Sequence, residues 1–381
     1  MTTIKSIQIV DLQSQYQRLK SEVDPAVQEV MTDGNFINGK QVSQFAEELS
    51  SYTGSRFTIP CANGTDALQL AYMALDLKQG DEIIIPAFNY VAAAEAACLL
   101  GLTVVFTDVD PVSFNIDPAT IESKITPATK AVVAVHLFGQ GCDLEAISSI
   151  CEKHNLFLIE DNAQAIGAEM IQGKFAGKKL GTIGHIGTTS FFPSKNLGCM
   201  GDGGALFCQD EELTARIKMM ANHGQKVKYH YDYVGINSRL DTIQAAILRV
   251  KLEHLDEFTK ARQKAASSYT RILKEKKGIT PPAISPFSTH VFHQYTILFE
   301  SNETRNRVKS QLQEAGIQSM IYYPSSLHLQ KAYAGTNLPT GSFPVSESLC
   351  ERVLSLPMHS EMTEEIVEFI CSKIDLSEIV R

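Results

Sequence analysis

The amino-acid sequence predicts an α/β protein whose largely parallel sheet is covered by helices on both faces. From about residue 57 onward, short apolar runs alternate with longer helix-favouring segments, a pattern typical of strands joined by crossover helices. The chain has 381 residues, of which 44% are hydrophobic and 20% charged, a balance that indicates a globular chain rather than a disordered one. Its length is sufficient for two domains.

The N-terminal part, residues 11–50, is expected to be largely helical because apolar residues recur at helical spacing from Leu12 to Val23. A loop is expected between residues 34 and 39, which are both glycine. The strands that we expect in the sheet are residues 57–61, 82–86, 103–107, 131–136, 156–160, 187–192 and 204–208. The helices that we expect between them are residues 65–77, 91–100, 143–153 and 211–222.

The C-terminal part has the pattern of a smaller α/β domain. Residues 239–276 favour helix and carry an apolar stripe, and prolines at 281, 282 and 286 mark the next loop. After this loop we expect a strand over 294–299 and helices near 303–315, 345–354 and 363–374. We therefore place a large domain at residues 1–245, with the N-terminal helical segment, and a small domain at residues 246–381.

One lysine, in the run Ser190-Phe-Phe-Pro-Ser-Lys195, stands between an apolar strand and a glycine-rich turn. Pro193 donates no ladder hydrogen bond and is expected to end the strand. Lys195 would then lie at a strand's carboxyl end, where open α/β sheets bind ligands. A lysine in a partly dry pocket loses its proton more readily and becomes a nucleophile. The alternative is a solvated surface lysine.

Two further segments place polar groups at strand ends. Asp161 follows an apolar strand and is suited to hold a cation or a protonated ring, although Asp161 or Asn162 could simply cap a helix. In Asn63-Gly64-Thr65 a short strand meets a helix, whose free amides bind phosphate; ordinary capping is the alternative. A lysine, an aspartate and a phosphate cup together are what pyridoxal 5'-phosphate (PLP) requires, so the sequence predicts this cofactor.

Five segments of the chain together form a recognisable combination. They are Asn63-Gly-Thr-Asp-Ala67, Pro86-Ala-Phe-Asn-Tyr90, Glu160-Asp-Asn-Ala-Gln164, Ser190-Phe-Phe-Pro-Ser-Lys195 and Gly235-Ile-Asn-Ser-Arg239. This combination resembles the DegT/StrS family of PLP-dependent nucleotide-sugar aminotransferases. The resemblance covers the chain from about Asp11 to about His359 and implies the aspartate aminotransferase-like fold, fold type I.

The resemblance implies roles for individual residues. Lys195 would be the catalytic lysine that joins the cofactor and moves a proton between carbons, and Asp161 would pair with the pyridine nitrogen. Asn237 would reach the cofactor phosphate of a neighbouring subunit, which implies a homodimer with composite active sites. The other implied cofactor contacts are Asn63, Gly64, Thr65 and Ser190 at the phosphate, Tyr90 stacked on the ring and Gln164 near its 3-hydroxyl.

Substrate contacts are implied in the same way. Arg239 could clamp an anionic substrate group in a bidentate manner, with a structural ion pair as the alternative. Five more residues lie in segments that border the sugar-nucleotide site in family members, and a packing role is the alternative for each; they are His223, His230, Tyr322, Tyr323 and His328.

The segments 235–248 and 354–359 are most similar to members that aminate C3 of 3-oxo sugars. The expected acceptor is UDP-2-acetamido-2-deoxy-3-oxo-glucuronic acid, on the way to diacetamido-uronic acids of bacterial O-antigens in lipopolysaccharide, and the expected donor is L-glutamate. A dTDP-linked 3-oxo or 4-oxo-6-deoxy sugar is the alternative substrate. A PLP-binding regulator without catalysis is the alternative of another class.

Charge and composition argue against other partners. The net charge of −9 disfavours a general nucleic-acid surface, and no histidine or cysteine motif has the spacing of a metal site. We expect no membrane span, because no apolar run approaches about 18 residues. The start lacks the apolar core of a signal peptide and the eight cysteines are scattered, so we expect a cytoplasmic protein.

Overall fold

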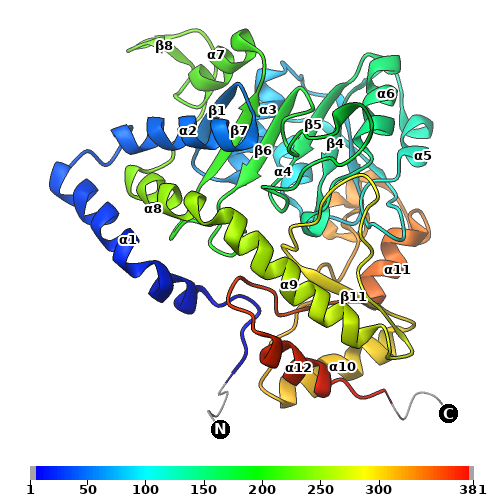
Figure 1. Cartoon of the computed structure of the whole chain (residues 1–381). Helices are drawn as coiled ribbons and strands as arrows, with labels where there is room; N and C mark the ends of the chain where they lie inside the picture. The colour runs from blue at the N-terminus through cyan, green and yellow to red at the C-terminus, as the bar shows by residue number, and fades with distance from the viewer. Residues whose placement is uncertain (1–5, 377–381) are drawn as a thin grey trace.

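The computed structural model describes residues 6–376, and its centre is a seven-stranded sheet (Figure 1). The strand order across the sheet is β1, β7, β6, β5, β4, β2, β3. All neighbouring strands are parallel except that β7 pairs antiparallel with β1 and with β6. The strands are β1 (Phe57–Cys61), β2 (Glu82–Pro86), β3 (Thr103–Thr107), β4 (Thr129–Val135), β5 (Phe157–Asp161), β6 (Ile186–Ser190) and β7 (Gly204–Cys208).

The predicted strands are confirmed, and four of them, β1, β2, β3 and β7, have the predicted bounds. The largest differences are two residues at one end of a strand: β4 begins at Thr129 and not at residue 131, and β6 ends at Ser190 and not at residue 192. The last cross-strand pair joins Ser190 to Gly204, and beyond it Phe191 is held by loop hydrogen bonds to Gly203 and Cys199. The chain therefore leaves the sheet before Pro193 is reached.

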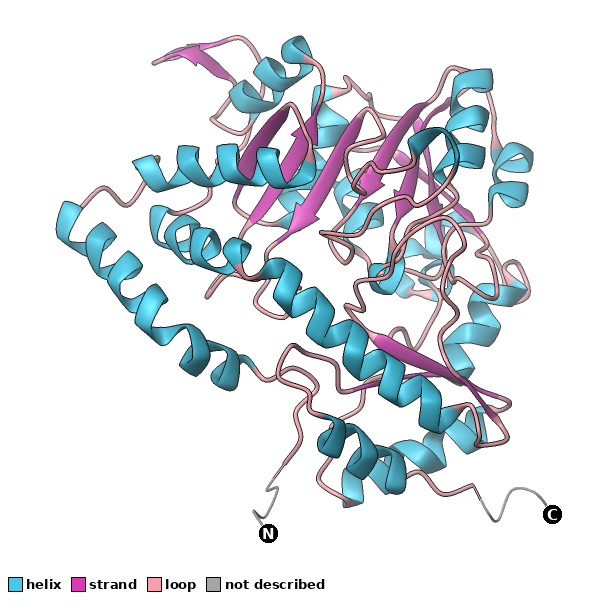
Figure 2. Ribbon diagram, in the orientation of Figure 1, coloured by secondary structure: helices cyan, strands magenta, loops and turns pink. Residues whose placement is uncertain are grey.

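Helices cover both faces of the sheet, as predicted, because strand side chains alternate between two apolar layers (Figure 2). Ile83 and Ile85 belong to the layer that contains α3 (Gly64–Ala74), α4 (Ala92–Leu99) and α7 (Glu211–Met220). Ile84, between them, belongs to the opposite layer with α6 (Leu144–His154). Because successive side chains point to opposite faces, both faces of each strand are covered and the sheet is buried.

The N-terminal segment forms two helices, α1 (Leu12–Asp33) and α2 (Lys40–Thr53). Asp11 caps α1 by accepting a hydrogen bond from the Ser14 amide, and Gly34, with φ +67°, ends it in the left-handed region that glycine favours. In Figure 1, α1 lies away from the sheet beside α8 (Thr242–Glu253). The predicted loop between Gly34 and Gly39 is confirmed.

The C-terminal part contains a three-stranded antiparallel sheet of β10 (Ile279–Thr280), β11 (Tyr295–Phe299) and β12 (Val353–Leu356). Its apolar core is shared with α9 (Leu255–Leu273), α10 (Asn302–Glu314) and α12 (Glu364–Ser372). The predicted end of the helix at residues 345–354 is wrong. Helix α11 (Pro344–Arg352) ends at Arg352, and the fully buried run 353–356 pairs with β11 as a strand. The domain boundary between residues 245 and 246 stays a prediction, and it falls inside α8.

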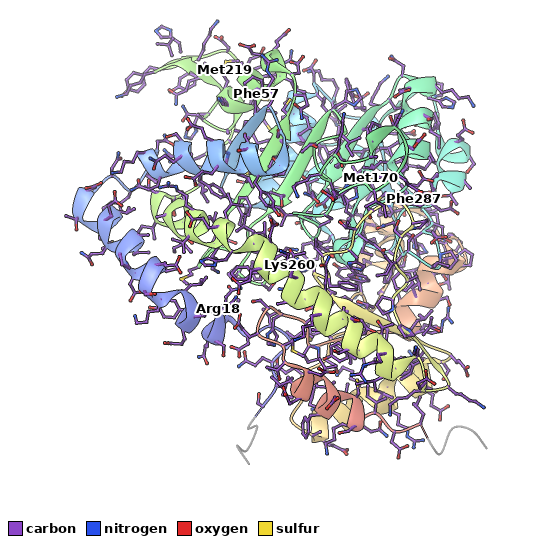
Figure 3. The ribbon with its side chains drawn as sticks, in the orientation of Figure 1. Arg18, Phe57, Met170, Met219, Lys260 and Phe287 are labelled. Carbon is purple, nitrogen blue, oxygen red and sulfur yellow. The ribbon has the colours of Figure 1, made fainter. Side chains whose placement is uncertain are left out.

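Two connections shape the site. Helix α9 extends from the large sheet toward the small one (Figure 2), separated from α8 only at His254. The loop 281–293 then returns to the large sheet, where Ser288 forms a β-bridge with Met170. Phe287 packs against the apolar layer that contains Ile84 and Met170. Figure 3 labels Met170 and Phe287 at this junction. The remaining short elements in the described part of the chain are α5 (Pro118–Ile121), the paired strands β8 (Gln225–Val227) and β9 (His230–Tyr231), and 3-10 helices at Glu122–Lys124, Leu137–Gly139, Gly173–Phe175, Leu327–Leu329 and Lys331–Thr336.

Candidate active site

Lys195 lies on the loop that leaves β6 at the carboxyl edge of the sheet, as the sequence predicts. The Lys195 amide donates to the Phe192 carbonyl at 2.8 Å, which closes a tight turn around Pro193. Farther along this loop, the buried Lys251 donates from Nζ to the Gly198 carbonyl at 2.7 Å. These bonds hold the loop that carries Lys195 from both sides.

The Lys195 side chain is half-buried and borders a cavity. Desolvation lowers its pKa to about 8, and the negative charge of Asp161 opposes this shift. Asp161 itself is buried, and burial raises its pKa, while a hydrogen bond from the Ala163 amide and the charge of Lys195 work in the other direction. The alternative of a fully solvated lysine is wrong for this fold.

The start of α3 forms a cradle for an anion. Asn63 caps the helix through a 2.8 Å hydrogen bond from the Asp66 amide to Oδ1, so the capping interpretation holds for Asn63. Among the described residues, no hydrogen bond uses the amides of Gly64 or Thr65. A Cβ added at Gly64 would stand 2.7 Å from the Ser190 Cβ, so only glycine fits here. Free amides beside a hydroxyl suit a phosphate.

Three aromatic or amide residues from distant segments line the space above the sheet. The Gln164 side chain accepts from the Phe138 amide at 2.8 Å and donates to the Tyr323 hydroxyl at 3.2 Å. The Tyr90 ring lies 6.2 Å from the Tyr323 ring, and Tyr90 remains 56% exposed. An exposed ring at this position can receive a flat ligand.

These residues surround one cavity of about 810 Å³. Ten of the predicted site residues line it: Asn63, Gly64, Thr65, Tyr90, Asp161, Gln164, Ser190, Lys195, Tyr322 and Tyr323. The volume of this cavity and the exposed Tyr90 leave room for a ligand larger than a single small ring.

Five other predicted site residues lie outside this cavity. His328 is buried, and both ring nitrogens are bonded within the chain, Nδ1 to the Ser326 hydroxyl and Nε2 to Glu347. The other four belong to the region from α7 to α8, where His223, His230 and Asn237 are exposed and Arg239 is half-buried. Within residues 6–376 Arg239 forms no ion pair, so its alternative role as a structural ion pair has no support there.

Several cavity or support residues were missed from the sequence. Asn89, His293 and Gln294 line the cavity, and His136 pairs with Glu160, which precedes the cavity residue Asp161 in β5. Asn89 follows the carboxyl end of β2, a position that would have identified it. The other residues come from segments far from Lys195 in sequence, and no local pattern distinguishes them from core residues.

The described residues contain no group of three or more His, Cys, Asp or Glu side chains that could hold a metal ion. Over the same part of the chain, none of the helices has the length and apolarity to cross a membrane.

A mostly parallel sheet with helices on both faces and a lysine loop at its carboxyl edge defines an α/β protein of the aspartate aminotransferase-like class, fold type I. Within this class, the chain belongs to the DegT/DnrJ/EryC1/StrS aminotransferase family, which it matches over residues 17–375.

Similar proteins cover nearly the whole chain. A pleiotropic regulatory protein of Geobacillus stearothermophilus is 43% identical over 97% of this chain and 98% of its own length. A UDP-2-acetamido-2-deoxy-3-oxo-D-glucuronate aminotransferase of Pseudomonas aeruginosa is 42% identical over 97% of this chain and 99% of its own length. The crystal structure of S. venezuelae DesV with a ketimine intermediate has a TM-score of 0.93 and 35% identity, covering 97% of each chain.

Proposed function

We propose that this chain is a PLP-dependent aminotransferase that moves an amino group from L-glutamate to a nucleotide-linked keto sugar. The observation that carries the proposal is that Lys195 and Asp161 share one cavity with the anion cradle at Gly64. These residues fit PLP, because the cradle supplies amides for its phosphate and Asp161 a carboxylate for its ring nitrogen. When bound, PLP would supply an electron sink for negative charge on a substrate carbon.

The role of Lys195 follows from its electrostatics. A pKa of about 8 leaves a useful fraction of the amine neutral near neutral pH, whereas an ordinary lysine is almost fully protonated there. With the cofactor bound, the neutral amine would hold a proton and move it between carbons. The buried Asp161 keeps its carboxylate dry, so that a cationic partner would be strongly favoured beside it.

For the acceptor we propose C3 of UDP-2-acetamido-2-deoxy-3-oxo-glucuronic acid. Two observations support this substrate: the similarity to the Pseudomonas protein of that name and the half-buried Arg239, which has no ion pair among the described residues. A guanidinium in this condition can bind a carboxylate in a bidentate manner. A dTDP-linked 3-oxo or 4-oxo-6-deoxy sugar is the alternative acceptor.

We further propose a cytoplasmic homodimer with composite sites. Asn237 and Arg239 lie outside the cavity of their own chain, and the adjoining segment exposes large apolar side chains, with Val234 at 89% exposure and Tyr229 at 72%. Exposed apolar side chains in such numbers are typical of an interface. A second copy would cover them and bring Asn237 and Arg239 to the cavity of its partner.

The deciding experiment is a product assay with L-glutamate and a panel of UDP- and dTDP-linked 3-oxo and 4-oxo sugars. Amination of one sugar at C3 is the expected result, and absence of amino transfer to every sugar would contradict the proposal. Borohydride reduction should fix the cofactor to Lys195, and mass spectrometry that finds it on another lysine, or on none, would contradict the site.

A second candidate function is a PLP-binding regulator without catalysis, which the name of the Geobacillus relative favours. The same assay separates the two functions. A regulator would retain bound cofactor on Lys195 but yield no amino sugar with any member of the panel.

A further inference from the structure

His293 is a buried side chain that borders the same cavity as Lys195. It lies just before β11, at the end of the loop 281–293 that returns to the large sheet, and only 5% of it is exposed. The residue before it, Phe292, has φ +47°, a region that favours glycine, so the surroundings fix the backbone there. Arg262 donates to the carbonyls of Phe292 and His293 at 3.1 and 3.4 Å and reinforces this placement.

One ring nitrogen of His293 has no partner. Among the described residues, seven buried side-chain nitrogen or oxygen atoms lack a hydrogen bond, and only Asn89 Nδ2 and His293 Nδ1 belong to residues that line this cavity. Buried polar atoms are nearly always paired in folded proteins, and each exception requires an explanation. His293 Nδ1 is buried in the ligand-free chain, and because His293 borders the cavity, a ligand bound there is the nearest group outside the chain that could pair with it.

The neighbouring side chains decide which ring nitrogen carries the proton. The Gln294 amide nitrogen lies 3.4 Å from His293 Nε2, so an NH₂ donor faces Nε2 and leaves the proton on Nδ1. Burial lowers the pKa of His293 well below its usual value, and the charges of Lys195 and Arg262 act in the same direction. The ring therefore stays neutral and presents an Nδ1–H donor.

We infer that His293 is a substrate-positioning residue whose Nδ1–H donates a hydrogen bond to an oxygen of the substrate. This inference rests on the proposed function. The acceptor oxygen belongs either to the carboxylate of the amino donor or to a hydroxyl or carbonyl of the keto sugar, and the two half-reactions distinguish these sources.

The test uses three variants of the cofactor-loaded enzyme, with rapid-mixing absorbance of each half-reaction. His293→Asn places an amide donor near the position of Nδ1, whereas His293→Gln places it near Nε2, and His293→Leu has none. We expect His293→Gln and His293→Leu to slow one half-reaction at least about tenfold and His293→Asn to retain most of its rate. Slowing with L-glutamate identifies the donor carboxylate; slowing with the sugar identifies the sugar oxygen.

Thermal melting of each variant separates this role from a structural one. If the His293 variants do not fold, Gln294→Leu leaves His293 in place but removes the group that sets its proton, and the same half-reaction should slow. Unchanged rates of both half-reactions in the folded variants would overturn the inference, as would equal slowing in His293→Asn and His293→Leu. If the wild-type enzyme shows neither half-reaction, the proposed function fails. The role of His293 is then tested by calorimetry, which measures the affinity of His293→Asn and His293→Leu for L-glutamate and for the sugar nucleotide. Tighter binding by His293→Asn than by His293→Leu would support the inference, and equal affinities would overturn it.

Discussion

The Nε2 atom of His136 lies 2.9 Å from a carboxylate oxygen of Glu160, and neither side chain is exposed. Glu160 also accepts hydrogen bonds from three backbone amides within residues 181–184. Burial by itself raises the pKa of Glu160, but the bonds from His136 and these amides outweigh burial, so the pKa lies below its usual value. Because Glu160 precedes Asp161 in β5, this buried network fixes the strand end that carries the site.

Glu160→Gln should lower the free energy of unfolding by about 1–3 kcal/mol, because one of its two oxygens becomes an NH₂ group that faces buried donors. Glu160 has a depressed pKa in the folded state, so its contribution is present above the ordinary glutamate pKa of 4.5 and is lost as the pH falls through the folded value. Urea unfolding at several pH values measures this. The exposed Glu314→Gln is the control, and equal effects of the two substitutions would contradict the prediction.

Asp161→Asn should lower the pKa of Lys195 below about 8, since the charge of Asp161 opposes the effect of burial. The rate at which an amine reagent modifies Lys195 in the cofactor-free protein, followed by mass spectrometry, should then rise at lower pH. Asp33→Asn, at the exposed end of α1, should leave the profile unchanged. A profile that moves to higher pH in Asp161→Asn would show that the two groups do not interact as the structure indicates.

Arg239→Ala should reduce kcat/KM for a UDP-linked 3-oxo uronic acid by an amount that corresponds to about 2–5 kcal/mol, the loss on breaking a buried charged pairing. The neutral 3-oxo counterpart should be affected little. Arg239→Lys keeps the charge but loses the bidentate geometry, so its kcat/KM for the uronic acid should lie between the values of the wild type and of Arg239→Ala. Steady-state kinetics with both sugars measure the difference, and an equal loss for both would refute the carboxylate contact.

Two impaired variants should complement each other if the active site is composite. Lys195→Ala and Asn237→Ala are each expected to be impaired alone, but a mixed dimer would hold both lesions in one site and neither in the other. Co-refolding should therefore restore activity toward half of the wild-type value per mixed dimer. Refolding each variant with itself is the control. If Asn237→Ala alone is impaired and a verified mixed dimer shows no gain, the site is contained within one chain.

Local sequence patterns were sufficient for most of the fold. The alternation of apolar runs predicted every strand of the large sheet, because burial on both faces leaves a continuous apolar signal in each strand. Sequence reasoning also placed Lys195 on a loop after β6, although the strand ends at Ser190 before Pro193 is reached. It placed Asn63 at the start of α3, because a capping residue acts on its immediate neighbours.

The sequence by itself determined the fold class, the family and the residues that local motifs bring to the carboxyl edge of the sheet. Only the tertiary structure decided that Val353–Leu356 is a strand, that His136 pairs with Glu160, and that His293 borders the cavity of Lys195. The physical reason is the same in each case. These interactions join segments that are distant in sequence, so neither the period of the hydrophobic pattern nor a neighbouring cap or turn residue records them.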